Sequence, residues 1–302
     1  GVRRIPTQGA FPLPLPLIGA DVGGSKTAVS VGDAANVRGR ALGPGGAVRP
    51  GRAIASAATI AETVRKALAA AGSPRGSVLV VGAAGAGRES ERMELEQALR
   101  TEALADRVRV TTDIEIALTA AFGEGPGIVV VAGTGSVVLG RDPEGRMLRR
   151  GGYGWQMGDE GSGYAIGRAA LGAVSRAQDG RSPETALTPV LMEVTRSLDF
   201  GALVRWAASA GPAEVAALAP HVLHTAERGD LVAQGIADYA ARELSALVLR
   251  LAEEFPTGER VGVALMGGML AEERSLRSAV LEKLDTEPAL RPLATVMDAT
   301  LG

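Results

Sequence analysis

Two short loops in this sequence combine glycine with hydroxyl side chains, a pattern suited to binding phosphate. The first follows an apolar run and reads Asp21-Val22-Gly23-Gly24-Ser25-Lys26-Thr27. Glycine lets a ligand approach the backbone, and consecutive N–H groups can form a concavity for anionic oxygen. Ser25 and Thr27 add hydroxyl groups, Lys26 adds positive charge, and the preceding carboxylate could hold a hydrated Mg²⁺. For this loop alone, an ordinary glycine-rich turn is an equal alternative, since short glycine motifs recur by chance.

The first loop differs from two common nucleotide-binding motifs. It lacks the Gly-x-x-x-x-Gly-Lys-Ser/Thr pattern of a P-loop. A strand is predicted to follow it over 27–31, whereas the dinucleotide fingerprint opens a helix. These differences restrict the nucleotide-binding folds to which the chain could belong.

The second loop, Gly133-Thr134-Gly135-Ser136, repeats the layout of the first. It lies between predicted strands over 128–132 and 137–141, and a third strand is predicted over 146–150. The first loop is likewise followed by strands predicted over 27–31 and 37–42. A repeated strand–loop–strand unit is more informative than either loop alone, and it predicts an internal duplication.

Strands and helices alternate along the rest of the chain, which predicts an α/β fold with mixed or parallel sheets covered by helices. Further strands are expected over 78–81, 108–111 and 261–266. Apolar spacing and Gly or Pro stops predict helices over 53–71, 89–104, 114–122, 164–177, 184–198, 200–210, 213–227, 230–255 and from about 270.

Gly123-Glu124-Gly125-Pro126-Gly127 is the clearest break in the chain, and we place a domain boundary there. Residues 1–16 contain four prolines and are expected to form a disordered leader. Residues 17–122 would form the N-terminal domain, and residues 123–302 a larger, more helical C-terminal domain. The last residues could return to the first domain.

Composition excludes several classes of function. The chain has 302 residues, of which 46% are hydrophobic and 22% charged, and its net charge is −2. This composition predicts a soluble, globular protein. There is no excess of basic residues of the kind that binds nucleic acid. The chain contains no cysteine, which excludes disulfides, thiolate catalysis and Cys-held metal clusters. His221 and His224 are its only histidines, so a metal would be a hard ion held by oxygen. No apolar run is long enough to cross a membrane, and the cytoplasm is the expected location.

Two carboxylates stand out between and after the loops. Thr112-Asp113 follows a predicted strand, and Gly154-Trp155-x-x-Gly158-Asp159-Glu160-Gly161-Ser162 lies in a glycine-dense segment. Together with the two loops and a late strand ending in Gly267-Gly268, these motifs resemble the actin/hexokinase/Hsp70 superfamily. Within it, they closely resemble the N-acetylglucosamine kinase family, which includes the BadF/BadG/BcrA/BcrD-type ATPases. The resemblance covers about residues 17–301, and the stretch from Gly154 to Ser162 is its most specific part.

The resemblance implies two ribonuclease-H-like domains with ATP and Mg²⁺ in a central cleft, where a small sugar is phosphorylated. The implied phosphate-binding residues are Gly23, Gly24, Ser25, Lys26, Thr27, Gly133, Thr134, Gly135 and Ser136. Gly267 and Gly268 would pack against adenosine, and Asp21 would position Mg²⁺ through water. Asp113 would be the general base and would also contact the sugar. Gly152, Tyr153, Gly154 and Asp159 would hold the sugar, and the protein is expected to be a homodimer.

Physical chemistry supports these roles independently of the resemblance. Phosphoryl transfer depends mainly on positioning and charge neutralisation. A sugar hydroxyl has a high pKa, so a carboxylate must accept its proton as attack proceeds. An ionised carboxylate accepts several hydrogen bonds, which would let Asp159 bind two hydroxyls.

Simpler structural interpretations remain for the same residues. Asp113 could be the N-cap of the following helix, and Asp159 or Glu160 could cap the helix that begins near Ser162. Trp155 could be a packing residue, and the Arg149-Arg150 pair could be a solvated strand end.

Three functions are consistent with the resemblance. The first is an ATP-dependent kinase that forms the 6-phosphate of N-acetylglucosamine or glucosamine. The second is an ATPase that activates a reductase or dehydratase, which the absence of cysteine disfavours. The third is a sugar sensor, which would need a DNA-binding module that 16 Pro-rich residues cannot supply. The loop from Gly43 to Val48 lacks the asparagine usual in sugar kinases of this family, which leaves the sugar open.

Overall fold

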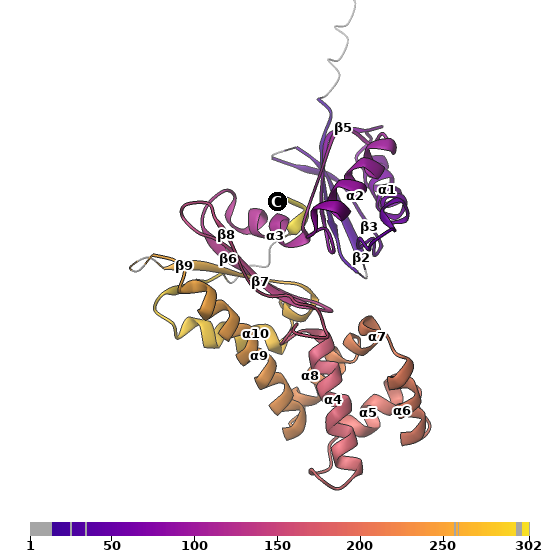
Figure 1. Ribbon diagram of the computed structural model, residues 1–302, viewed down its shortest axis with the longest axis vertical. Coiled ribbons are helices and arrows are strands. Elements are labelled where there is room, and N and C mark those ends of the chain that lie inside the picture. Colours follow the sequence, from indigo (N-terminus) through magenta and orange to yellow (C-terminus); the bar gives the residue numbers. More distant parts are fainter. Residues whose placement is uncertain are drawn as a thin grey trace, which may run out of the picture. The chain divides into compact units, whose positions relative to one another are not determined.

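The computed structural model describes residues 14–24, 26–33, 35–256, 258, 260–293 and 298–301, and it forms two compact units, each built around a five-stranded sheet (Figure 1). The first unit contains the described residues up to Val22 together with Lys26–Thr111. The second contains the chain from Thr112 onward and the loop that begins at Gly23. The units therefore divide before the segment Gly123–Gly127, where the sequence places the domain boundary. Residues 1–13 of the predicted leader, and Ser25 of the first loop, lie outside the described residues.

The first sheet has the strand order β3-β2-β1-β4-β5. Its strands are β1 (Leu17–Val22), β2 (Lys26–Gly32), β3 (Val37–Pro44), β4 (Gly76–Ala83) and β5 (Ala105–Thr111). The β1–β2 and β2–β3 pairs are antiparallel, and the β1–β4 and β4–β5 pairs are parallel. Two helices, α1 (Ala53–Ala70) and α2 (Glu89–Thr101), lie side by side against this sheet (Figure 1).

The second sheet has the order β10-β9-β6-β7-β8, which is the order of the first sheet read from its other edge. Its strands are β6 (Gly127–Ala132), β7 (Ser136–Arg141), β8 (Met147–Gly151), β9 (Val261–Met266) and β10 (Leu290–Pro292). The antiparallel and parallel pairs also correspond strand for strand. The predicted α/β fold with an internal duplication is therefore confirmed.

The two hairpins that carry the predicted phosphate loops have equivalent registers. In the first, Val22 at the end of β1 pairs with Thr27 of β2. In the second, Ala132 at the end of β6 pairs with Ser136 of β7. Thr27 and Ser136 are thus structurally equivalent residues, each facing the last residue of the leading strand.

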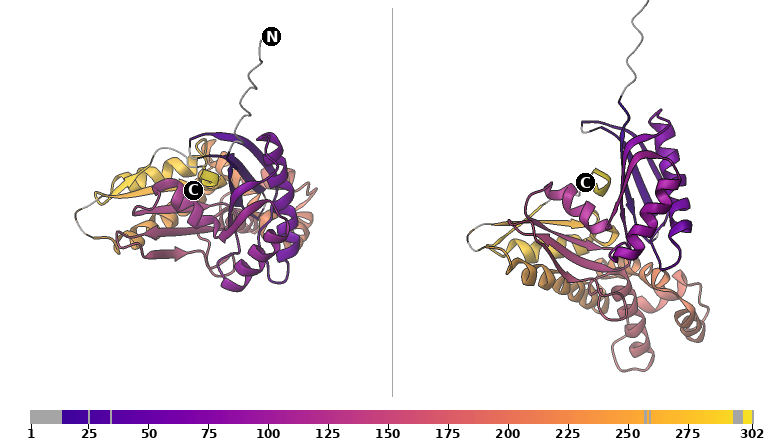
Figure 2. Two further views of the ribbon diagram at one scale, coloured as in Figure 1. Left: turned by 90° about the horizontal axis from the view of Figure 1, so that it is seen from above. Right: turned by 45° about the horizontal axis from the view of Figure 1, so that its top comes forward.

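Helices cover both faces of the second sheet. In Figure 2, α3 (Asp113–Phe122) lies on one face, and α9 (Leu231–Ala252) and α10 (Ser275–Asp285) lie on the other. Leu244 and Val248 of α9 are fully buried in the core of this unit, where each side chain stabilises the fold by roughly 1.5–3 kcal/mol. The remaining helices are α4 (Gly163–Gln178), α5 (Leu187–Val194), α6 (Phe200–Ser209), α7 (Pro212–Ala216) and α8 (Ala219–Glu227), with the 3₁₀ turns η1 (Gly268–Leu270) and η2 (Ala299–Leu301). None of the helices in the described part of the chain has the length and hydropathy of a membrane span.

Several predicted elements differ from the structure. The single helix expected over 213–227 is two helices, and Pro220 lies in the first turn of α8, where its missing N–H is tolerated. The helix expected from about Leu270 begins only at Ser275, because η1 forms the turn after β9. The helix over 184–198 is shorter than expected. Strand β10, which includes Pro292, was not predicted.

Candidate active site

Asp21 and the first loop lie at the carboxyl end of β1. Asp21 pairs with Gly82 of the parallel strand β4, so the ends of these two strands meet at one edge of the first sheet. The Ala84 N–H donates to the Val22 carbonyl oxygen at 2.8 Å, which fixes the segment after β4 beside the loop. Lys26 is exposed at the start of β2, and a side chain at Gly24 would meet nothing within 4 Å. This part of the loop is therefore open to a ligand.

The segment from Gly43 to Val48 is tied to the same edge. The Val48 N–H donates to the Ala84 carbonyl oxygen at 2.8 Å, and the Ser56 hydroxyl donates to the Ala47 carbonyl oxygen at 3.1 Å. The segment that lacks the expected asparagine thus has a fixed backbone beside the ends of β1 and β4.

The second loop is held by the N-terminus of α4. The N–H groups of Gly163 and Tyr164 donate to the carbonyl oxygens of Gly133 and Thr134 at 2.8 and 3.1 Å. Helix N-termini have N–H groups without intrahelical acceptors, so the loop carbonyls satisfy them. Neither Thr134 nor Gly135 uses its own N–H to donate to another described residue. The N–H groups of Thr134 and Gly135 can therefore donate to a ligand, whereas the carbonyl oxygens of Gly133 and Thr134 already accept hydrogen bonds from α4.

The equivalent residues Thr27 and Ser136 play equivalent structural roles. Both are buried, and their hydroxyl groups donate to the carbonyl oxygens of Pro44 and Glu160 at 2.8 and 2.7 Å. Each hydroxyl proton is thus used to hold a neighbouring segment beside its phosphate-type loop. Their role in binding phosphate stays a prediction.

Asp159 connects the second loop to the glycine-dense segment. Its carboxylate is buried and accepts hydrogen bonds from the backbone of Ser136 and of Gly154. A Cβ atom on Gly135 would lie 2.6 Å from Asp159 Oδ2, so a larger residue there would displace this carboxylate. Asp159 itself has φ of +60°, a left-handed conformation that Asp and Asn adopt more readily than most residues.

Burial raises the pKa of Asp159 above its ordinary value, and the neighbouring Glu160 carboxylate adds to this rise. The hydrogen bonds from Ser136 and Gly154, and the positive charge of Arg149, oppose it. The helix-capping interpretation of Asp159 and Glu160 is wrong, because the Ser162 hydroxyl caps α4 by accepting from the Ala165 N–H at 3.2 Å.

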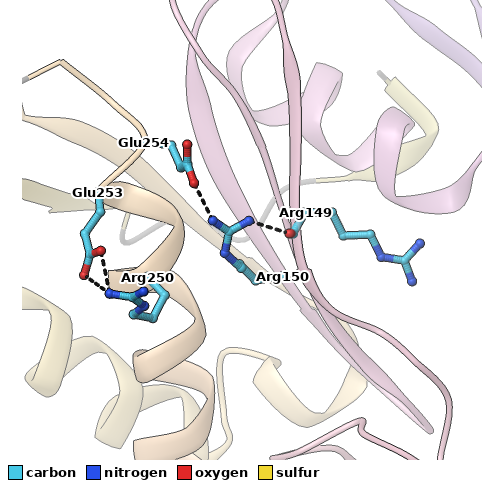
Figure 3. Close-up of polar contacts among 5 residues, drawn as sticks. All are labelled: Arg149, Arg150, Arg250, Glu253 and Glu254. Carbon is cyan, nitrogen blue, oxygen red and sulfur yellow. Dashed lines mark hydrogen bonds and ion pairs between the residues drawn. The ribbon is translucent and has the colours of Figure 1, made fainter.

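Arg149 and Arg150 point to opposite sides of β8, as Figure 3 shows, because side chains alternate along a strand. Arg150 forms an ion pair with Glu254 at 2.6 Å, just after α9. The Arg149 guanidinium donates to the carbonyl oxygens of Gly151 and Gly152. It thereby holds the start of the glycine-dense segment from Gly152 to Asp159, which we call the sugar-type segment. Arg149 is exposed near the end of β8, as the solvated-strand-end interpretation predicts, and its guanidinium also binds these two carbonyl groups. The alternation of strand residues is the signal that could have separated the two arginines.

The end of β9 brings a second glycine turn beside the second loop. β6 and β9 are parallel and pair Val131 with Met266, so Gly267 follows at the strand edge where Gly133 also lies. Gly267 has φ of +93°, and a Cβ atom there would overlap the backbone of Ala132. These contacts require glycine and place the predicted adenosine turn and the predicted phosphate loop at one edge of the second sheet.

A buried arginine that sequence reasoning missed supports this turn. Arg277 of α10 is 3% exposed and donates to the carbonyl oxygens of Leu265 and Leu270 at 3.0 and 3.1 Å, on either side of Gly267-Gly268. It also donates to the Leu293 carbonyl oxygen at 3.4 Å. Burial lowers the pKa of Arg277 from its ordinary value. Nothing in the helical pattern of 275–285 distinguishes this residue from a surface arginine.

We expect Arg277→Met to destabilise the protein by roughly 1–3 kcal/mol, because buried carbonyl groups lose their donor. We also expect a several-fold higher KM for ATP, since the Gly267-Gly268 turn would lose its support. Urea denaturation and initial rates measure the two effects. Arg291→Met, at an exposed position of the neighbouring strand β10, is the matched control and should change stability by less than about 0.5 kcal/mol. Equal unfolding midpoints for the two variants would contradict the role assigned to Arg277.

Asp113 is the first residue of α3, and Thr112 separates it from the end of β5. The cap of this helix is Thr112, whose hydroxyl accepts from the Glu115 N–H at 3.1 Å, so the capping interpretation of Asp113 is wrong. The Asp113 side chain is partly exposed. Its carboxylate is therefore not explained by helix capping.

Comparison with known proteins identifies the family. Residues 18–290 match the model of the BadF/BadG/BcrA/BcrD ATPase family. The chain belongs to this family.

The most similar relatives include two curated kinases. An N-acetylmuramic acid/N-acetylglucosamine kinase of Clostridium acetobutylicum is 34% identical over 197 residues, which span 64% of each protein. An N-acetyl-D-glucosamine kinase of Dictyostelium discoideum is 30% identical over 234 residues, which span 74% of this chain and 73% of the relative. The matched stretch thus covers less than two thirds of the Clostridium protein.

Solved structures confirm the fold over nearly the whole chain. A Chromobacterium violaceum protein named as a candidate N-acetylglucosamine kinase has a TM-score of 0.78 and 28% identity, covering 96% of this chain and 97% of its own. A ROK hexokinase of Thermus thermophilus has a TM-score of 0.56 and 20% identity, covering 95% and 96% of the two chains. The similarity to the Thermus thermophilus protein supports only the fold.

Proposed function

We propose that this protein is an ATP-dependent sugar kinase that phosphorylates the 6-hydroxyl of an amino sugar, N-acetylglucosamine or glucosamine. The observation that carries the proposal is the position of Asp159. Its carboxylate joins the Gly133–Ser136 loop to Gly154, so a phosphate-type loop and a sugar-type segment form one connected cluster. The names of the two curated relatives support the same reaction.

The donor is held by backbone N–H groups and positive charge. The N–H groups of Thr134 and Gly135 bind phosphate oxygen, and Gly267 and Gly268 pack against adenosine. In the first hairpin, Gly23, Gly24, Ser25 and Lys26 contribute further phosphate contacts. Such contacts stabilise the charge on the transferred group, which is the main requirement of phosphoryl transfer.

The acceptor is held by the segment from Gly152 to Asp159. The Asp159 carboxylate accepts hydrogen bonds from two sugar hydroxyls, and Tyr153 and the neighbouring glycines shape the site. Asp113 accepts the proton of the 6-hydroxyl as its oxygen attacks the γ-phosphorus and the bond to the ADP oxygen breaks. The products are a sugar 6-phosphate and ADP.

Mg²⁺ fits this site as a partner of ATP. Within the described residues, no group of three or more His, Asp or Glu side chains is arranged to hold a metal. Mg²⁺ commonly keeps several waters and binds through one or two carboxylates and substrate phosphates. Asp21 at the end of β1 would be that carboxylate, and the ion would neutralise phosphate charge.

The alternative of an ATPase activator lacks chemical support. Such activators hold an iron–sulfur cluster through cysteine, and this sequence has none. The expected homodimer stays a proposal that light scattering after size exclusion would measure.

A panel of acceptors tests the proposed function. We expect purified protein with Mg²⁺ and ATP to release ADP in the presence of N-acetylglucosamine or glucosamine, at a rate well above that without sugar. Glucose, mannose and their N-acetylated forms are the comparison sugars. ADP release that no sugar increases would contradict the kinase assignment and favour a sugar-independent ATPase.

A further inference from the structure

Three glycines with positive φ begin the sugar-type segment and the residue before it. Gly151, Gly152 and Gly154 have φ of +68°, +71° and +87°. Glycine loses more conformational freedom on folding than any other residue, so this backbone keeps one conformation only where other groups hold it. The groups that hold it therefore determine where the proposed acceptor segment lies.

Arg149 of β8 holds one end of this glycine stretch. Its Nε donates to the Gly151 carbonyl oxygen at 3.2 Å, and its Nη2 donates to the Gly152 carbonyl oxygen. A Cβ atom on Gly152 would lie 2.6 Å from Arg149 Nη2 and 2.8 Å from Val137 Cγ2, so the guanidinium packs directly against this backbone. The planar fork of an arginine holds two acceptors in one fixed geometry, whereas the ammonium of a lysine acts as a single point charge.

Asp159 holds the other end of the stretch. Its buried carboxylate accepts a hydrogen bond from the Gly154 N–H, two residues after the carbonyl group that Arg149 binds. The same carboxylate accepts from the Ser136 N–H of the second loop. Arg149 and Asp159 thus bind opposite ends of the tripeptide from Gly152 to Gly154.

Beyond Gly154, packing and a backbone hydrogen bond hold the segment. The Trp155 ring packs against the Tyr164 ring with centroids 5.1 Å apart and a tilt of 55°, so the packing interpretation of Trp155 is correct. The Gly158 N–H donates to the Gly154 carbonyl oxygen at 2.8 Å. These contacts involve no atom of Arg149, so its effect is confined to the first part of the segment.

Arg149 also acts on the charge of Asp159. Burial is the main cause that raises the pKa of Asp159, and the N–H groups of Ser136 and Gly154 lower it. Of the neighbouring charged side chains, Glu160 raises this pKa and Arg149 lowers it. The arginine therefore favours the ionised carboxylate, which is the form that accepts hydrogen bonds from two sugar hydroxyls.

The exposure of Arg149 separates these effects from a role in the core. Figure 3 shows its side chain pointing away from Arg150, which forms the ion pair with Glu254. Substitution of an exposed side chain usually changes stability little. A substitution of Arg149 is therefore expected to change sugar binding more than folding.

We propose that Arg149 is a positioning residue of the acceptor site, which holds the backbone from Gly152 to Gly154 where the sugar and the Asp159 carboxylate require it. This inference rests on the proposed kinase function. Arg149 acts through Gly152 and Asp159, and it makes no contact with the transferred phosphoryl group.

Arg149→Gln tests this inference, because it removes both the charge and the fork. We expect kcat/KM for N-acetylglucosamine to fall about 10- to 100-fold, mainly through a higher KM, as is usual for lost hydrogen bonds from a charged group. The KM for ATP should stay within about 3-fold of wild type, as for a substitution away from the ATP site. The acid limb of the pH profile of kcat/KM should move to higher pH, because the loss of a nearby positive charge raises the pKa of Asp159.

Arg150→Gln is the matched control, since it makes the same change at the next residue of β8, on the opposite side of the strand. Its kcat/KM should stay within about 3-fold of wild type with an unchanged acid limb. Arg149→Lys keeps the charge without the fork, so it should retain the wild-type acid limb and still have a higher KM for the sugar. Urea denaturation of each variant checks that the fold is retained.

The outcomes separate the two proposals. Equal falls in kcat/KM for Arg149→Gln and Arg150→Gln, or a rise in the KM for ATP as large as that for the sugar, would overturn the positioning role and leave the kinase function intact. An Arg149→Gln variant with the wild-type KM for the sugar would have the same consequence. Wild-type protein whose ADP release neither N-acetylglucosamine nor glucosamine increases would overturn the kinase function and the inference with it.

Discussion

Asp113→Asn should lower kcat by about 10²- to 10⁴-fold, which is the usual contribution of a general base. The amide keeps the size of the side chain but cannot accept a proton from the 6-hydroxyl. Helix α3 should still form, because Thr112 rather than Asp113 supplies its cap. ATP should bind with unchanged affinity, since no phosphate contact is assigned to Asp113.

Glu115→Gln is the matched control for this variant. It removes a carboxylate from the same first turn of α3, so it has the same effect on the interaction with the helix dipole. We expect its kcat to stay within about 3-fold of wild type. Steady-state kinetics and ATP titration of both variants measure the difference. Near-normal turnover of Asp113→Asn would mean that another group accepts the proton.

Asp159→Asn should lower kcat/KM for the sugar by about 10²-fold or more while leaving the fold intact. Hydrogen bonds to a charged group contribute roughly 1.5–3 kcal/mol each, and this carboxylate is proposed to accept two from the sugar. The amide is tolerated structurally, because asparagine adopts the left-handed conformation that Asp159 occupies. Glu160→Gln, next in the chain, is the control and should change kcat/KM by less than about 5-fold.

The stability of Asp159→Asn relative to wild type should depend on pH. Because the pKa of Asp159 is raised in the folded state, mainly by burial, this carboxyl favours folding when protonated. Its contribution is fully present below the unfolded pKa and is lost as pH rises through the folded pKa. Asp159→Asn should therefore be at least as stable as wild type at pH 7.

Wild type should gain stability relative to Asp159→Asn as the pH falls, because its carboxyl then becomes protonated. Urea denaturation of both proteins at pH 7 and near pH 4 gives the comparison. A variant much less stable than wild type at pH 7 would show that Asp159 is mainly structural. The loss of activity would then have to be assigned to misfolding instead of sugar binding.

The sequence was most informative about the repeated hairpins. Glycine loops between apolar runs are local features, and their repetition predicted the two sheets that the structure contains. The same reasoning failed for β10, because a strand of three residues that includes Pro292 has no detectable pattern of alternation. The same reasoning predicted one helix where the structure has α7 and α8. Pro220 did not mark the division, because proline occurs in the first turn of a helix as well as in breaks between helices.

The site shows a similar limit. Residue type identified Asp159 and the glycines, but the partner of each group depends on contacts far apart in the chain. Ser136 binds the carbonyl oxygen of Glu160, and Arg277 binds those of Leu265 and Leu270. No spacing in the sequence predicts such contacts. These contacts hold the Gly133–Ser136 loop and the Gly267-Gly268 turn in place.

The structure of the reaction product tests the central proposal most directly. Phosphorus–proton correlation NMR on the product formed from N-acetylglucosamine and ATP shows which carbon carries the phosphate. The account predicts a single phosphomonoester correlated with the two protons on carbon 6, formed in equal amount to ADP. Inorganic phosphate as the only new phosphorus signal, or a phosphate attached to carbon 1, would contradict it.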